Sequence, residues 1–280
     1  MTMRIHFGFR LALDCANPTP ATFLVDVHPS RSRDVTVQTP VLVRPHLPMA
    51  TETDLFGNIS RRMVLPAGRT VIEHDGVILD SGEHDVVNFA ARQTPVGDLP
   101  AEAMPFLVGS RYCETDLMAG EAWRLFGGVP EGWARVQAIC DFVHDHIRFN
   151  YNDADSTRTA TRAYQEQRGV CRDFAHLAVT FCRAMNIPAR YCTGYLGDIG
   201  VPRDPAPMDF SAWFEAYLDG RWYTFDARHN IPRIGRVVIA RGRDAADVAI
   251  VSTYGPHFLA GFEVWTEEMD EVEQGATAAA

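Results

Sequence analysis

Cys171 is the residue in this sequence whose type and position best suit a nucleophile. It follows Gly169, which gives the backbone freedom, and Pro188 ends the segment that it opens. Within that segment apolar residues recur at the three-and-four spacing of one helix face: Cys171, Phe174, Ala175, Ala178, Phe181, Cys182 and Met185. The first turn of a helix favours a thiolate, through unpaired N–H groups and the helix dipole. The alternative is a small core residue, because most free cysteines are buried.

A β-hairpin follows this helix and places polar residues on one of its faces. Its parts are Phe210–Leu218, the two-residue turn Asp219-Gly220 and Arg221–Ala227. This turn predicts that Trp213 faces Asp226, and that Ser211 faces Arg228 on the same side of the sheet. Ser211 and Asp226 are then diagonal neighbours, about 7–8 Å apart at the backbone. A long side chain could close that gap, whereas a serine hydroxyl falls short.

The chain before residue 95 has the pattern of strands and shows no helical period of useful length. Residues 4–14 alternate between apolar and polar side chains, as a half-buried strand does. Further strand-like runs are Thr22–Val27, Val35–Val43, Ile59–Leu65 and Thr70–Leu79. Asp75-Gly76 predicts a hairpin turn inside the last run. We therefore expect an all-β, sandwich-like domain over residues 1–100, closed by a linker at Thr94–Pro100.

The second half of the chain combines helices with strands. Helices are predicted at Leu117–Phe126, at Trp133–Ile147 and from Cys171 onward. Strands are expected at Ala189–Leu196 and in further segments that could join the sheet of the hairpin, namely Val237–Ala240, Val248–Ser252 and Phe262–Trp265. Residues 101–265 are thus interpreted as a second, α+β domain. The acidic and alanine-rich residues 266–280 are expected to be a disordered tail.

Composition narrows the range of functions. A formal net charge of -10, with no basic run, gives no support to nucleic-acid binding. No apolar stretch reaches the roughly 18 residues of a membrane span. Residues 1–7 lack the apolar region of a signal peptide, so the expected location is the cytoplasm. The 6 cysteines lack CxxC spacing and the acidic residues are not clustered, so neither a metal nor a cofactor is expected.

Several motifs occur in a fixed order along the second half. They are Gly-Val-Cys-Arg-Asp-Phe-Ala-His at 169–176, Ile-Pro-Ala-Arg-Tyr at 187–191, Gly-Tyr-Leu at 194–196, Asp-Phe-Ser-Ala-Trp-Phe-Glu-Ala-Tyr-Leu at 209–218 and Trp-Tyr-Thr-Phe-Asp at 222–226. Over roughly residues 110–245 the chain resembles the bacterial transglutaminase-like superfamily. The resemblance implies a papain-like α+β core in which a helix carrying the cysteine packs against an antiparallel sheet. It also implies a Cys-His-Asp triad that acts on amide bonds of peptides, proteins or small amides through a thioester.

The triad carries over with one departure. The resemblance assigns the nucleophile to Cys171 and the aspartate to Asp226, but the position of the family histidine holds Ser211. Serine cannot accept the thiol proton at neutral pH or return it to the leaving amine. His229 is the candidate for a substitute base, three residues after Asp226. In a regular strand it would point to the opposite face, so the chain must turn there, which Asn230-Ile231-Pro232 makes plausible.

Two other readings remain open. In one, no histidine takes part; the helix dipole with Arg172 or Arg228 stabilises the thiolate, and the enzyme transfers acyl groups from activated thioesters or esters. In the other, the site is inactive and the fold binds a peptide or a partner protein. Candidate substrate contacts are Trp213, Arg228 and Tyr151, although Trp213 is equally interpretable as a core residue.

Overall fold

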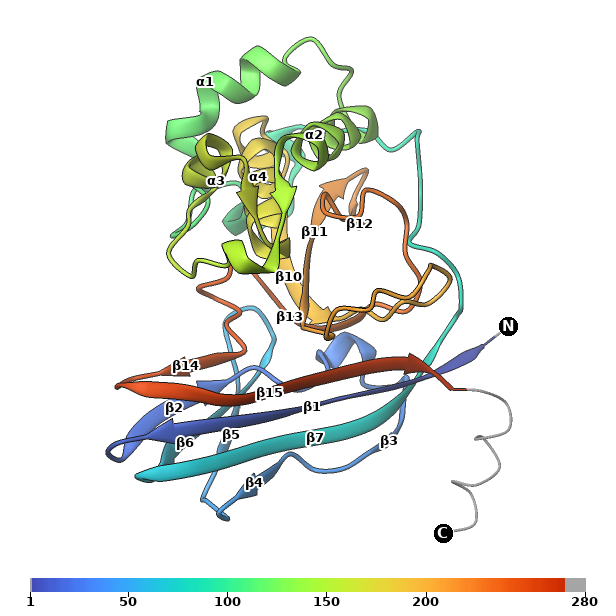
Figure 1. Ribbon diagram of the computed structural model, residues 1–280. Helices are drawn as coiled ribbons and strands as arrows, with labels where there is room; N and C mark the ends of the chain where they lie inside the picture. The colour runs from blue at the N-terminus through green and yellow to red at the C-terminus, as the bar shows by residue number, and fades with distance from the viewer. Residues whose placement is uncertain (1, 270–280) are drawn as a thin grey trace.

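The strands within residues 3–80, together with two strands within residues 251–268, form two antiparallel sheets that pack against each other (Figure 1). The structure is a computed structural model, and it describes residues 2–269. One sheet has the order β15-β1-β7-β3, with β4 also paired to β7, and the other has the order β14-β2-β6-β5. Their bounds are β1 (Met3–Cys15), β2 (Thr19–Phe23), β3 (Val35–Gln38), β4 (Leu42–Arg44), β5 (Ala50–Thr53), β6 (Ile59–Leu65), β7 (Gly68–Asp80), β14 (Val251–Thr253) and β15 (His257–Glu268).

Alternation in β1 builds the core of these sheets, as predicted. The side chains of Ile5, Phe7, Phe9, Leu11 and Leu13 are at most 1% exposed. They pack with apolar residues of the second sheet, including those of β2 and β6. Burying each of these side chains is worth about 1.5–3 kcal/mol, so this one strand is a large part of the core.

The predicted turn at Asp75-Gly76 is wrong. Strand β7 continues through both residues and pairs with β1 from Met3 opposite Asp80 to Cys15 opposite Gly68. A Cβ atom at Gly76 would lie only 2.8 Å from Cζ of Phe7. The glycine therefore makes room for a buried aromatic ring. Glycine occurs in strands for this reason as well as in turns, and the sequence pattern alone does not tell the two cases apart.

The second part of the chain is an α+β core, as predicted (Figure 1). Helices pack on one face of a four-stranded antiparallel sheet of order β12-β11-β10-β13. The helices are α1 (Thr115–Phe126), α2 (Trp133–His146), α3 (Ala160–Glu166) and α4 (Cys171–Ala184). The strands of the sheet are β10 (Ala189–Tyr195), β11 (Ser211–Leu218), β12 (Arg221–Phe225) and β13 (Val237–Gly242), and β8 (Arg148–Phe149) pairs separately with β9 (Arg168–Gly169).

The hairpin β11–β12 has the predicted register, but it is shorter than expected. Leu218 pairs with Arg221 across the turn, and the ladder ends where Phe214 pairs with Phe225. After Phe225 the chain turns, because the N–H of Asn230 donates to the carbonyl oxygen of Asp226 at 2.8 Å. The predicted pairs of Trp213 with Asp226 and of Ser211 with Arg228 lie beyond this ladder and do not form part of it.

The segments predicted at Val248–Ser252 and Phe262–Trp265 do not join the sheet of the hairpin, so that expectation is wrong. Strand β14 pairs with β2, and β15 pairs with β1 over most of its length. Residues 266–268 belong to β15, which corrects the predicted start of the tail; residues 270–280 lie outside the described part of the chain. Sequence alternation identifies a strand but does not identify its partner when that partner is distant in sequence. Among residues 2–269, no helix is long and apolar enough to cross a membrane.

Candidate active site

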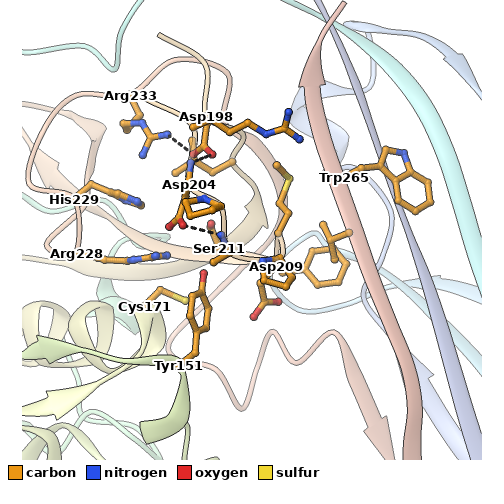
Figure 2. Close-up of a pocket in the computed structure, with 18 of the residues that line it drawn as sticks. Tyr151, Cys171, Asp198, Asp204, Asp209, Ser211, Arg228, His229, Arg233 and Trp265 are labelled. Atoms are coloured by element: carbon orange, nitrogen blue, oxygen red, sulfur yellow. Dashed lines mark hydrogen bonds and ion pairs between the residues drawn. The ribbon is translucent and has the colours of Figure 1, made fainter. Parts of the chain in front are cut away.

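Cys171 opens onto a cavity that also holds most of the other predicted site residues (Figure 2). The cavity has a volume of about 540 Å³, and Cys171 lies at its wall in the first turn of α4. Residues from three other segments share the wall: Tyr151, Ser211, Arg228 and His229. The Cys171 residue is partly exposed and is one of the residues that line the cavity.

The turn after β12 brings His229 onto Asp226. Nδ1 of His229 lies 2.9 Å from Oδ2 of Asp226. Oδ1 of Asp226 accepts the backbone N–H groups of Arg228 and His229 at 3.0 and 3.1 Å, which holds the carboxylate across the turn. With Nδ1 bound to the carboxylate, Nε2 is the ring nitrogen left to exchange a proton, and the ring lines the cavity (Figure 2).

Asp226 is held as a carboxylate by a buried arginine that the sequence analysis missed. Nη2 of Arg236 lies 2.9 Å from Oδ2 of Asp226, and Nε of Arg236 lies 2.9 Å from Oδ2 of Asp85. Burial by itself would raise the pKa of the Asp226 carboxyl, but Arg236 and His229 outweigh it and hold that pKa well below its usual range. An ionised carboxylate at Nδ1 orients the imidazole and stabilises its protonated form.

Comparison with known proteins concerns the fold of the region that carries these residues. The family model of the transglutaminase-like superfamily matches residues 123–227, which contain Cys171, Ser211 and Asp226. The crystal structure of a Cytophaga hutchinsonii protein, proposed to be a cysteine protease, is 29% identical and superposes with a TM-score of 0.83, covering 96% of this chain and 92% of that chain. Residues 123–227 thus match the transglutaminase-like superfamily, and nearly the whole chain shares its fold with the Cytophaga hutchinsonii protein.

Two further proteins match this chain in part. The Mycobacterium leprae protein ML0607 is 35% identical over 94 residues, which are 31% of this chain and 32% of that protein. The matched stretch thus spans about a third of the length of that curated relative. The periplasmic domain of TgpA from Pseudomonas aeruginosa is 15% identical, with a TM-score of 0.40 over 80% of this chain and 90% of that chain.

In this transglutaminase-like core Ser211 opens strand β11, opposite Gly194 of β10. Its carbonyl oxygen accepts the hydroxyl of Thr193 at 3.3 Å, and the residue is 8% exposed. The family histidine is expected at this position. The structure places the hydroxyl of Ser211 at the cavity, on the same wall as Cys171.

Trp213 is not at the cavity. It is 2% exposed and packs with Cys192 and Val238, and the guanidinium of Arg236 lies 5.0 Å from the centre of its ring. Of the two interpretations offered by the sequence, this position fits a core residue. Trp213 thus contacts Arg236, the residue that in turn binds the carboxylate of Asp226.

Arg228 and Tyr151 do reach the cavity, and they support each other. The guanidinium of Arg228 lies 3.8 Å from the ring centre of Phe149 and 5.8 Å from that of Tyr151. Stacking of this kind holds an arginine side chain in one orientation. A fixed positive charge therefore lies at the cavity wall near the sulfur.

The expected thiolate at Cys171 is contradicted by the surroundings of the sulfur. Burial raises the pKa of the Cys171 thiol to about 11, although Arg228 and the backbone N–H of Ala212 oppose the rise. The start of a helix lowers a thiol pKa only where desolvation does not outweigh it. In the described chain, residues 2–269, no hydrogen bond joins Sγ to His229. The resting group is thus a thiol that needs a base during attack.

The pH dependence of alkylation tests this state. Because the Cys171 thiol is protonated at neutral pH, its rate of alkylation by iodoacetamide should rise about tenfold per pH unit between pH 6.5 and 9.5. Mass spectrometry of the peptide that contains Cys171 measures the rate at each pH, and Cys171→Ala identifies the signal. A rate that is constant below pH 7 would contradict the protonated state and favour a thiolate paired with a cation.

Proposed function

We propose that this protein is a thiol-dependent acyl-transfer enzyme that attacks amide bonds through a thioester on Cys171, with His229 as its base. One observation carries the proposal: the sulfur and an imidazole bound at Nδ1 by a carboxylate line the same cavity. This is the arrangement of a nucleophile, a base and an orienting group. It supplies, from position 229, the function that Ser211 cannot perform.

The reaction follows from these groups. Sγ of Cys171 attacks the amide carbon while Nε2 of His229 takes the thiol proton, directly or through one water. The C–N bond then breaks, and the imidazolium returns its proton to the departing amine, leaving a thioester on Cys171. Water or a second amine, deprotonated by His229, attacks the thioester carbon and releases the thiol. Asp226 stays ionised throughout and stabilises the imidazolium.

Backbone groups at the start of α4 suit the negative charge that develops during attack. Cys171 is the first helical residue, and the first N–H groups of a helix have no partner within it. An N–H aimed at the developing oxyanion is worth about 2.7–4 kcal/mol of barrier in other enzymes. The guanidinium of Arg228 adds positive charge on the same side of the cavity.

Substrate and location are parts of the same proposal. Substrates are peptides, proteins or small amides, and hydrolysis is supported by the 29% identical Cytophaga hutchinsonii protein, itself proposed to be a cysteine protease. We place the protein in the cytoplasm, because its cysteines carry free thiols, which is typical of a reducing compartment.

Trapping of the acyl-enzyme tests the proposal. The wild type is incubated with a glutamine-containing peptide or with p-nitrophenyl acetate, and hydroxylamine then captures the acyl group as a hydroxamate. Amide-derived hydroxamate that is lost in Cys171→Ala supports the proposal. Acylation by the ester alone would replace it with acyl transfer from activated donors. Acylation by neither would leave an inactive binding scaffold.

Relocation of the base gives a sharper test. His229→Ala removes the imidazole, and Ser211→His restores one at the position expected from the family. If the missing base is the only defect of His229→Ala, the double variant should be at least about tenfold more active than His229→Ala alone. The reason is that a general base contributes about 10²–10⁴-fold to the rate. The rate of amide turnover measures the recovery. Ser211→Ala in the His229→Ala background is the matched control and should recover nothing.

A further inference from the structure

A second cavity adjoins the sulfur from the side of the β-sheets. It also has a volume of about 540 Å³, within the range of ligand sites, and its lining is mostly apolar. Cys171 and Ser211 line both cavities, so the sulfur lies where the two meet. The first cavity is more polar, and Asp198, Asp204 and Arg233 are among its lining residues. The second combines its apolar wall with Asp155, Arg172 and Asp209.

The apolar wall of this second cavity includes residues of two paired strands, β1 near the start of the chain and β15 near the end of the described residues. Leu11 of β1 pairs with Phe262 of β15, and Leu13 pairs with Leu259. Residues that are directly opposite share one face of a sheet, and all of these line the cavity. Phe258 is next in sequence to Leu259 and pairs with Asp14, which places it on the other face.

Strand β15 is the edge strand of its sheet (Figure 1), and its residues line both cavities. Val264 and Trp265 both line the first cavity, although neighbouring side chains of a strand point to opposite faces. The edge of β15 itself therefore faces the cavity. An edge strand has backbone N–H and C=O groups that an extended peptide can pair with.

We propose that the substrate is a polypeptide that lies extended along β15 and places a bulky aliphatic or aromatic side chain in the apolar cavity beside Cys171. This specifies the substrate class of the proposed function and rests on it. An apolar side chain gains by leaving water against the aliphatic and aromatic residues of this wall. The charged side chains of Asp155, Arg172 and Asp209 also line the cavity. The charged first cavity then takes the polar part of the chain on the other side of the reacting amide.

Alkylating probes test this site without requiring turnover. The rate of Cys171 alkylation is compared for iodoacetamide and N-(2-phenylethyl)iodoacetamide, each normalised to its rate with N-acetylcysteine. Transfer of the phenyl ring into the cavity should make the second reagent at least about tenfold faster. A normalised ratio near one would overturn the apolar subsite, even if amide turnover had been demonstrated. Conversely, a high ratio in a protein without turnover would leave the subsite standing and remove only the catalytic proposal.

Matched variants of β15 locate the effect. Leu259 and Phe262 are 47% and 39% exposed, so Leu259→Asp and Phe262→Asp should fold, and both should bring the ratio close to one. Phe258 is 68% exposed on the opposite face, and Phe258→Asp should keep the wild-type ratio. Retention of the ratio in Leu259→Asp, or its loss in Phe258→Asp, would contradict the assignment.

The extended polypeptide is tested by lengthening the probe. Iodoacetyl-Phe-Ala-Ala-amide offers the same ring together with backbone groups that can pair with the edge of β15. It should react several-fold faster than the phenylethyl reagent after the same normalisation. If the added residues give no gain in rate, the proposal of an extended polypeptide is wrong, and a small apolar acyl group would be favoured instead.

Discussion

His229→Ala is expected to lower kcat for amide substrates by about 10³-fold, within the range for loss of a general acid–base. The thiol of Cys171 is protonated at rest, and in the proposed mechanism His229 is the group that accepts its proton during attack and protonates the departing amine. Steady-state kinetics on a peptide amide measure the loss. KM should change little, because the imidazole acts on the transition state rather than on substrate binding.

The leaving group provides the control for this prediction. A p-nitrophenyl ester needs no protonation of its leaving group, so the acylation step of His229→Ala should lose much less with this ester than with the amide. The rate of Ser211→Ala should stay within about threefold of the wild-type rate on both substrates. A change of this size is well below the contribution of a general base. Equal losses on amide and ester would indicate that His229 shapes the cavity instead of transferring protons. A Ser211→Ala loss as large as that of His229→Ala would assign the essential role to the hydroxyl.

Asp226→Asn is expected to have the second large effect, a loss of both activity and stability. Loss of the carboxylate removes the acceptor that orients the imidazole, and the same change in a serine protease costs about 10⁴ in kcat. It also leaves the buried Arg236 with only its Asp85 partner. Breaking a buried ion pair typically costs about 3–5 kcal/mol, which urea unfolding would detect as a lower midpoint.

Asp85→Asn is the matched control, because it removes the other partner of Arg236 but leaves the contact between Asp226 and His229 intact. It should lower the midpoint of unfolding while losing far less than the 10⁴-fold of Asp226→Asn. A comparable loss of kcat in both variants would mean that the arginine, and not the carboxylate, orients the site.

The contribution of Asp226 to stability should depend on pH in a specific direction. Its pKa is lowered by folding, so the folded protein gains stability from the carboxylate at every pH above the unfolded value of about 3.9. The difference in unfolding free energy between wild type and Asp226→Asn should therefore be constant from pH 7 to 5. It should shrink as the pH falls below about 4. A difference that grows on acidification would contradict the assignment of an ionised Asp226.

Local signals in the sequence predicted much of the architecture. The three-and-four spacing after Cys171 corresponds to α4, and Asp219-Gly220, with φ angles of 48° and 80°, forms the two-residue turn. The same reasoning failed at Gly76, where the glycine accommodates a ring from another strand. It also failed for β14 and β15, because their partners β2 and β1 lie more than two hundred residues away.

The candidate site was predictable only in part, for a related reason. The position of His229 three residues after Asp226, with Asn230 and Pro232 following, gave a local reason to expect a turn. No local sequence signal predicted the pairing of Arg236 with Asp226, because no residue spacing is typical of an ion pair between a loop and a strand end. The pKa of Cys171 depends on how deeply the first turn of α4 is buried, and the helix pattern carries no measure of that depth.

Pairing of the first strand with the last described one has a consequence for synthesis. Strand β1 leaves the ribosome long before β15, its neighbour in the sheet, because more than two hundred residues separate them. The α+β core lies between them in sequence, and a nascent chain folds from its N-terminal end. A core that is already folded must then wait, with one edge of β1 unpaired, until β15 arrives. Nascent chains stalled before residue 257 should accordingly bind holdase chaperones, and chains that include β15 should release them.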